Sequence, residues 1–240
     1  MIKIANKLEK IEEGIADACR RVGRDRSEIT IVVVTKTVEI DSIKEALKLG
    51  YSDFGENRVQ HLRQVAADVQ AYAQSQGGEA SFSPNIKWHM IGHLQRNKVK
   101  QVLDITSLIH SVDTLRLAEE ISDAAVKADI QAGVLLQVNC SGEPQKYGVP
   151  VGAATHLAEQ IATMDNLRLC GLMTMAPLTM NKDIVRACFV RARELFEEIR
   201  GERITGDDFC HLSMGMSQDY EIAVEEGATI LRIGSAIFAM

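Results

Sequence analysis

The chain has 240 residues, of which 46% are hydrophobic and 25% charged, a composition typical of globular proteins. Its net charge of −6 argues against nucleic-acid binding, which needs a clustered excess of basic residues. Aromatic residues make up only 5%, so the core must consist mainly of aliphatic side chains, as in α/β proteins. One basic cluster is present, and we interpret it as a helix end and loop: Arg20, Arg21, Arg24 and Arg26.

The five cysteines are scattered along the chain, without the close spacing of a zinc site or a redox pair. We therefore expect no metal site and small buried thiols in a reducing compartment. The first residues alternate charged and apolar groups, unlike a signal peptide, and no apolar run is long enough to span a bilayer. These features predict a cytoplasmic protein without a membrane segment.

In chain order, residues 2–22 have the period of an amphipathic helix, and from Ile29 onward short Val- and Ile-rich segments alternate with helical ones. Such alternation predicts a parallel sheet. Eight strands in this length predict a single (β/α)8 TIM-type barrel domain over residues 1–240, with an additional N-terminal helix. A doubly wound open sheet is the alternative. The predicted strands cover residues 28–36, 51–57, 86–92, 107–113, 133–139, 167–175, 209–215 and 229–235.

Five amphipathic segments are predicted as the intervening helices, over residues 42–49, 58–72, 114–128, 153–164 and 182–200. Asp41, Asp113 and Asn181 are the expected N-caps, and Gly50 and Gly201 the expected stops. Residues 73–85 are polar and aperiodic, which indicates an extended surface loop.

A lysine follows the first strand. Val32, Val34 and Lys36 share one strand face, so Lys36 is expected to point into the barrel mouth. Functional residues of this fold gather at the carboxyl ends of the strands, and a partly desolvated lysine can attack an aldehyde as the free amine. The alternative is a lysine that simply extends into solvent.

The last strand and its neighbour suggest an anion site. Arg232 shares a face with Ile230 and points either into the barrel or toward a helix. Gly234 and Ser235 follow at the start of a short helix, where backbone N–H groups can hold a phosphate. The preceding loop offers three further residues for the same anion: Ser213, Gly215 and Ser217. An aldehyde-reactive amine opposite an anion site fits pyridoxal phosphate.

Several motifs together resemble the pyridoxal phosphate homeostasis protein family. They are VTKT (34–37), DFGENRVQ (53–60), WHMIGHLQRNK (88–98), HSVD (110–113), VN (138–139), KYG (146–148), GLMTMAP (171–177), LSMGMSQDYEIAVEEG (212–227) and LRIGSAIF (231–238). They run over nearly the whole chain in family order. The resemblance implies a barrel like the N-terminal domain of alanine racemase, with pyridoxal 5′-phosphate bound to the lysine after the first strand.

The resemblance also implies roles for particular residues. Lys36 would form the Schiff base and Arg232 would lie near the pyridine nitrogen. The phosphate would be held by Ser213, Gly234 and Ser235, and the pocket lined by Asn57, His89, His93 and Met214; His89 could alternatively be a hydrogen-bonded core histidine. Two departures stand out: Val38 and Glu39 replace a basic residue and a proline, and residues 73–85 are longer than in compact relatives.

The sequence is compatible with two classes of function, a binding protein and an enzyme. An arginine can only donate to the ring nitrogen, which keeps that nitrogen unprotonated and disfavours much of the cofactor's carbanion chemistry. We therefore expect a monomeric, non-catalytic carrier or buffer that supplies the cofactor to apoenzymes. A weak amino-acid racemase is the first alternative. Tyr147 could lie near the pocket, but a surface or core position is the expectation for each tyrosine. A cofactor-free lysine aldolase is the second.

Overall fold

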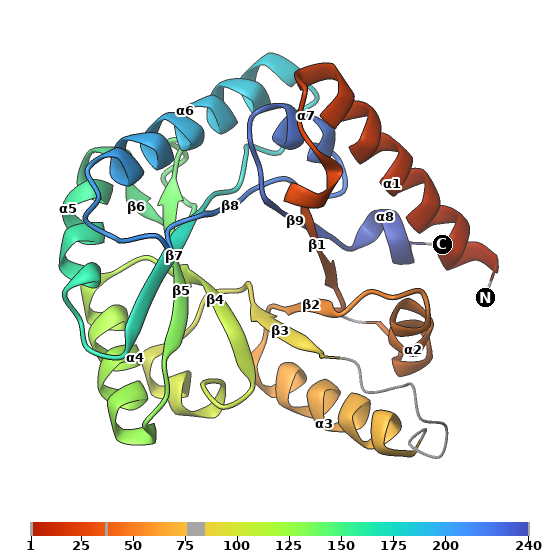
Figure 1. Ribbon diagram of the computed structural model, residues 1–240, viewed down its shortest axis with the longest axis horizontal. Coiled ribbons are helices and arrows are strands. Elements are labelled where there is room, and N and C mark those ends of the chain that lie inside the picture. The colour runs from red at the N-terminus through yellow and green to blue at the C-terminus, as the bar shows by residue number, and fades with distance from the viewer. Residues whose placement is uncertain (1, 37, 76–84, 240) are drawn as a thin grey trace.

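The computed structural model describes residues 2–36, 38–75 and 85–239, which form a closed barrel of eight parallel strands (Figure 1). Neighbouring strands follow the order β4-β3-β2-β1-β9-β8-β7-β5, and β4 also pairs with β5. That last pairing closes the sheet, so the predicted barrel is confirmed and the open sheet is excluded. The strands are β1 (Thr30–Val34), β2 (Asp53–Glu56), β3 (Lys87–Met90), β4 (Thr106–Val112), β5 (Ala132–Asn139), β7 (Leu167–Met173), β8 (His211–Ser213) and β9 (Ile230–Ile233).

A ninth strand, β6 (Val149–Pro150), pairs with the end of β5 through Val138 and Val149. We did not predict it, because two residues are too short to show a period. It belongs to the loop that follows β5 and therefore lies at the carboxyl end of the barrel, where functional groups are expected.

The five predicted helices are present, and α1 (Ile2–Val22) is the predicted additional helix. The turn between β3 and β4 is a 3₁₀ helix, η2 (Arg96–Gln101), and a second, η1 (Arg26–Glu28), precedes β1. The remaining helices are α2 (Ile40–Lys48), α3 (Val59–Ser75), α4 (Leu115–Ala128), α5 (Val151–Ala162), α6 (Lys182–Gly201), α7 (Tyr220–Glu225) and α8 (Ser235–Phe238).

Several predicted helix ends were wrong. Asp41 lies within the first turn of α2 after the N-cap Glu39, and Thr114 rather than Asp113 caps α4 by accepting from the Leu117 N–H. Asn181 caps α6 as predicted, but Gly201 is the last residue of that helix rather than its stop.

Gly50 does follow α2 with a φ of +92°. This is the left-handed region that favours glycine.

Residues 73–75, predicted as the start of the surface loop, belong to α3 instead, which continues to Ser75. Residues 76–84 lie outside the described residues. Val38 is half-buried and packs against the main core, so this departure from the family pattern makes an apolar contact.

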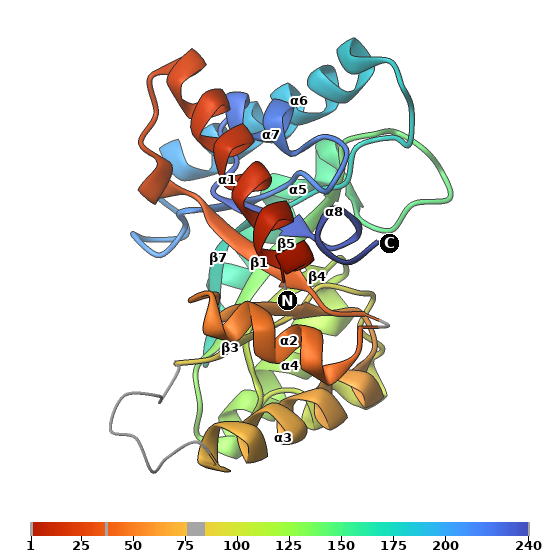
Figure 2. The same ribbon diagram turned by 90° about the vertical axis from the view of Figure 1, so that its right-hand side faces the viewer.

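The N-terminal helix α1 lies along the outside of the barrel against α7 and α8 (Figures 1 and 2). The basic cluster at its end pairs largely with acidic groups. Arg26 Nε donates to Glu12 at 2.7 Å, Arg24 Nε to Glu28 at 2.9 Å, and Arg21 Nε to Glu225 at 2.6 Å. These contacts agree with the interpretation of the cluster as a helix end and loop.

Buried apolar side chains form two separate clusters. The larger one lies between the strands and the helices. The smaller one, which we call the inner apolar cluster, lies inside the barrel and consists of Val32, Leu108, Leu135, Cys170, Met173 and Ile230. Among the described residues, no helix is both long and apolar enough to cross a membrane.

Candidate functional site

The end of β1 is tied to the end of β2 at the barrel mouth. Thr35 is fully buried, its N–H donates to the Gly55 carbonyl at 3.1 Å, and its hydroxyl donates to Glu56 Oε1 at 2.5 Å. The other oxygen of Glu56, Oε2, lies 2.8 Å from Nδ1 of His61 on α3. Because both carboxylate oxygens of Glu56 have hydrogen-bond partners, the free-energy cost of burying this group is offset. The backbone that leads into Lys36 is therefore firmly placed.

Lys36 itself lies in the turn that follows, where the Val38 N–H donates to the Thr35 carbonyl at 3.0 Å. Its side chain is exposed. The residue is therefore accessible from solvent at the carboxyl end of the barrel rather than enclosed within it.

The turn after β9 lies directly against the end of β1. A Cβ on Gly234 would come within 3.1 Å of Val34 Cβ and 3.2 Å of the Val34 carbonyl oxygen. The N–H groups of Gly234 and Ala236 both donate to Ser217 Oγ, at 3.4 and 3.0 Å. Two backbone donors that converge on one oxygen can equally serve an oxygen of a bound anion.

The loop between β8 and α7 supplies that hydroxyl and has a constrained backbone. Gly215 has a φ of +91°, and a Cβ there would lie 2.5 Å from the Cβ of Ala223. Asp219 Oδ1 accepts from the Met216 N–H at 2.6 Å, and burial raises the pKa of this carboxyl. These contacts fix the loop around Ser217 next to the first residues of α8.

Arg232 points into the barrel below this turn and is almost fully buried. Its NH1 donates to Ser213 Oγ at 2.7 Å and its NH2 to the Thr174 carbonyl at 3.0 Å. Burial lowers the pKa of Arg232 to about 10, so the guanidinium remains protonated at neutral pH. A fixed cation therefore lies inside the barrel.

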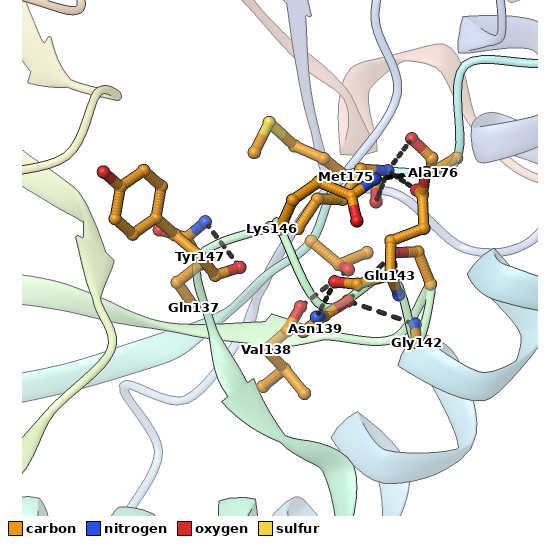
Figure 3. Close-up of polar contacts among 12 residues, drawn as sticks. Gln137, Val138, Asn139, Gly142, Glu143, Lys146, Tyr147, Met175 and Ala176 are labelled. Atoms are coloured by element: carbon orange, nitrogen blue, oxygen red, sulfur yellow. Dashed lines mark hydrogen bonds and ion pairs between the residues drawn. The ribbon is translucent and has the colours of Figure 1, made fainter.

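The opposite rim is formed by the loop after β5 (Figure 3). Lys146 Nζ donates to the Ala176 carbonyl at 2.7 Å and pairs with Glu143 at 2.5 Å, which joins this loop to the one after β7. The Tyr147 ring stacks on His93 with centroids 4.3 Å apart, and the Tyr147 carbonyl accepts from Gln137 Nε2 at 3.3 Å. The loop thus connects the segments after β3 and β7 across one side of the mouth.

Comparison with known proteins decides the family. The family described as "Alanine racemase, N-terminal domain" matches residues 7–240. A protein of Aquifex aeolicus named "Pyridoxal phosphate homeostasis protein" is 39% identical over 97% of this chain and 96% of its own length. The chain belongs to the pyridoxal phosphate homeostasis protein family. A relative of the same name from Escherichia coli K12 is 35% identical over 99% of this chain and 97% of its own length.

Solved structures agree with the fold of this homeostasis family. A Bifidobacterium adolescentis protein described as unknown superposes with a TM-score of 0.91 at 37% identity, covering 98% of this chain and 94% of its own. PipY of Synechococcus elongatus, in a structure described as having PLP bound, gives a TM-score of 0.75 at 29% identity, covering 94% and 100%. Alanine racemase of Clostridium difficile has a TM-score of 0.71 at 11% identity, which shows a shared fold alone.

Within this family member, the residues expected at the cofactor occupy different depths. Gly234 is half-buried and Ser235 exposed, both at the start of α8 and close to the end of β1. Arg232 lies deeper, inside the barrel. Ser213 is fully buried, and its hydroxyl contacts His110 and Arg232.

The four residues expected to line the pocket also have distinct surroundings. The Met214 side chain is fully buried in the larger core rather than in the inner apolar cluster. Asn57 is half-buried, and its main chain packs so closely on Gly92 that a Cβ there would lie 2.3 Å from the Asn57 carbonyl oxygen. His89 lies inside the barrel in a hydrogen-bond network, whereas His93 stands at the rim.

Sequence reasoning missed the supporting residues. Glu56 was not predicted, although a carboxylate at the end of a buried strand was a possible signal. Thr174 contributes a main-chain carbonyl, which no residue type reveals. His110 and Asp53 lie on strand faces that alternation places inward, and a pairwise comparison of inward polar residues on adjacent strands could have found them.

Proposed function

We propose that this protein binds pyridoxal 5′-phosphate at the barrel mouth through Lys36 and acts as a cytoplasmic carrier or buffer of the cofactor. The chain would do so as one monomeric domain over residues 1–240. When bound, the cofactor supplies an aldehyde carbon and an electron-withdrawing ring. Lys36 would hold that carbon as a Schiff base, formed by attack of the amine nitrogen with loss of one water.

The observation that carries the proposal is the buried Arg232. A guanidinium inside a barrel is costly unless it has partners, and here Ser213 and the Thr174 carbonyl leave it oriented and protonated. Its remaining donors suit a ring nitrogen that accepts a hydrogen bond. The donor set therefore fits the proposed cofactor.

The anionic end of the cofactor fits the turn after β9. Gly234 and Ala236 direct their N–H groups at one oxygen, and the short distance from Gly234 to Val34 brings this turn beside the strand that leads to Lys36. We propose that Gly234, Ser235 and Ser217 bind the phosphate. Asn57 would contribute at the neighbouring rim, and Met214 would support the loop from the core.

The exposure of Lys36 favours a carrier over a closed catalytic site. A solvent-accessible amine can take up the cofactor and release it to another amine, such as that of an apoenzyme. A donor-only partner such as Arg232 leaves the ring nitrogen unprotonated, which weakens the ring as an electron sink. We infer a non-catalytic role, and we expect the loaded protein to interconvert L- and D-alanine no faster than the free cofactor.

The decisive experiment combines absorbance spectra with mapping of the attachment site. Protein loaded with pyridoxal phosphate is reduced with borohydride, and the mass of the modified peptide is determined. We expect the adduct on residue 36 in the wild-type protein and no adduct after Lys36→Ala.

Lys87→Ala serves as the matched control, because Lys87 begins β3 at the opposite end of the barrel. This variant should keep the cofactor absorbance and the adduct on Lys36. An adduct on another residue would contradict the site assignment, and a wild-type protein that binds no cofactor would contradict the function.

A further inference from the structure

A continuous row of hydrogen bonds runs through the barrel interior from β2 to β9. Asp53 Oδ1 lies 3.1 Å from His89 Nε2, and His89 Nδ1 lies 2.9 Å from His110 Nε2. His110 Nδ1 then lies 3.0 Å from Ser213 Oγ, which accepts from Arg232 NH1 at 2.7 Å. We call these five residues the polar chain. His89, His110, Ser213 and Arg232 are each at least 95% buried, and Asp53 is partly buried.

The Asp53 end determines where the hydrogens lie. Burial pulls the pKa of Asp53 upward, but the hydrogen bonds from His89 and Ser52 and the charge of Lys87 outweigh it, so the net pKa lies below its usual value. The ionised carboxylate can only accept, so His89 Nε2 carries a hydrogen. A neutral His89 then accepts at Nδ1, and His110 must donate from Nε2.

The Arg232 end is consistent with the same order. Complete burial, together with the charge of Arg232, holds the pKa of His110 well below its usual range, so its ring is neutral. With its hydrogen on Nε2, His110 accepts at Nδ1 from the Ser213 hydroxyl, whose oxygen accepts from Arg232. Every donor in the polar chain therefore points toward Asp53.

The opposite order leaves a hydrogen without an acceptor. If His110 donated to Ser213, the serine oxygen would accept from both His110 and Arg232. The serine hydrogen would then need an acceptor of its own. Among residues 2–36, 38–75 and 85–239, however, Ser213 Oγ has side-chain hydrogen bonds only with His110 and Arg232. That order would also require a protonated, almost fully buried His89 or a protonated Asp53.

We propose that Asp53, His89 and His110 are positioning residues for Arg232, holding Ser213 as its acceptor so that the guanidinium faces the bound ring nitrogen in one fixed orientation. This inference rests on the proposed function for its last step. Hydrogen bonds aligned in one direction reinforce one another, and an ionised end fixes that direction. Asp53 begins β2, so its carboxylate acts from the amino end of the barrel on the cofactor at the carboxyl end.

Other charged groups border the polar chain without belonging to it. Lys87 acts on Asp53, His211 on His110, and Asp219 on Arg232. Lys87 and His211 are unchanged in Asp53→Ala, so a change seen after this substitution is assigned to the carboxylate.

The first test needs no cofactor and no variant of the polar chain. In cofactor-free protein labelled with ¹⁵N-histidine, long-range ¹H–¹⁵N spectra report which ring nitrogen carries the hydrogen. We expect Nε2–H and an unprotonated Nδ1 for both His89 and His110 at neutral pH. A hydrogen on Nδ1 of either ring would overturn the order of donors, whether or not pyridoxal phosphate binds.

The second test uses protein loaded with pyridoxal phosphate and Asp53→Ala. We expect the pH midpoint of the cofactor's absorbance change to move by about one unit, and its dissociation constant to rise about tenfold. Ser111→Ala is the matched control, because Ser111 lies on β4 beside His110 and its buried hydroxyl has no partner among the described residues. Ser111→Ala should leave both values unchanged.

The two tests separate the two proposals. If Asp53→Ala lowers only the melting temperature and leaves the spectrum and its pH profile as in wild type, the positioning role is overturned and the residue is merely structural. If wild-type protein takes up no cofactor, the proposed function fails, while the histidine spectra still decide the order within the polar chain.

Discussion

The barrel interior contains two regions built on different principles. The inner apolar cluster fills it with aliphatic and sulfur-containing side chains from β1, β4, β5, β7 and β9. The polar chain crosses the same interior on β2, β3, β4, β8 and β9. Apolar filling is what a barrel of this type needs for stability. A buried row of polar groups adds desolvation cost and is tolerated only when every member is satisfied.

This difference indicates which region serves stability and which serves function. The apolar cluster needs only volume and shape, and its members could be exchanged for others of similar size. The polar chain needs particular donors and acceptors in one order, which is a requirement of orientation rather than of folding. Variants of the two regions should therefore differ in what they change.

The largest expected effect on stability comes from the inner apolar cluster. Leu135 is fully buried within it, so Leu135→Ala should lower the free energy of unfolding by about 2–5 kcal/mol. Denaturation in urea would measure this loss. The histidine hydrogens of the polar chain should remain on Nε2 in the folded variant; a loss below about 1 kcal/mol, or an altered histidine spectrum, would break the division between the regions.

A smaller effect is expected where the two regions meet. Gly55 lies on β2 beside His89, and a Cβ there would come within 2.7 Å of Val32 Cγ1 and 3.2 Å of Ile91 Cδ1. Because valine is stiff at χ1, Gly55→Ala should destabilise the fold by about 1–3 kcal/mol, measured by the same denaturation.

Gly152 provides the matched control for this substitution. It lies in α5, and a Cβ there would meet no atom within 4 Å among its described surroundings. Gly152→Ala should therefore stabilise the protein by about 0.5–1 kcal/mol through helix propensity. Equal effects of the two substitutions would mean that the barrel interior is not closely packed at Gly55.

Much of the fold could be predicted because it depends on local pattern. The strands around Val32 and Leu135 are aliphatic runs, and α1 has a clear helical period, so both the barrel and the additional helix follow from the sequence. Helix ends were less predictable. Asp113 and Thr114 are both good N-caps, and only the tertiary position of β4 decides that Thr114 is used.

The strand face of several candidate-site residues could be predicted from the sequence, but how deeply each residue is buried could not. Alternation correctly placed Arg232 on the face of Ile230, but it could not decide between the barrel interior and the helix layer. β8, which ends at Ser213, is only three residues long. Such a short strand shows no period from which the burial of Ser213 or the core position of Met214 could be predicted. The exposure of Lys36 depends on a turn formed after β1, which strand periodicity does not describe.

A further effect on stability depends on pH and tests the neutral histidine of the polar chain. Burial holds the pKa of His110 well below its usual range and also lowers that of His211. Below pH 6.5 the unfolded chain therefore binds protons that the folded protein does not, so stability falls as the pH falls. For His110 alone the loss at pH 5.5 should be about 1.4 kcal/mol relative to its value well above pH 6.5.

Urea denaturation at a series of pH values would measure this dependence. His110→Asn should remove the His110 part of the slope, and His211→Asn the other part, while the inner apolar cluster contributes no slope. Asp53, whose pKa is lowered, stays ionised over this range and adds nothing to it. Asp219, whose pKa burial raises, would contribute a slope of opposite sign. If stability still falls with pH after both substitutions, protonation outside these two histidines controls acid stability. The contrast between the two interior regions would then lie in their packing alone.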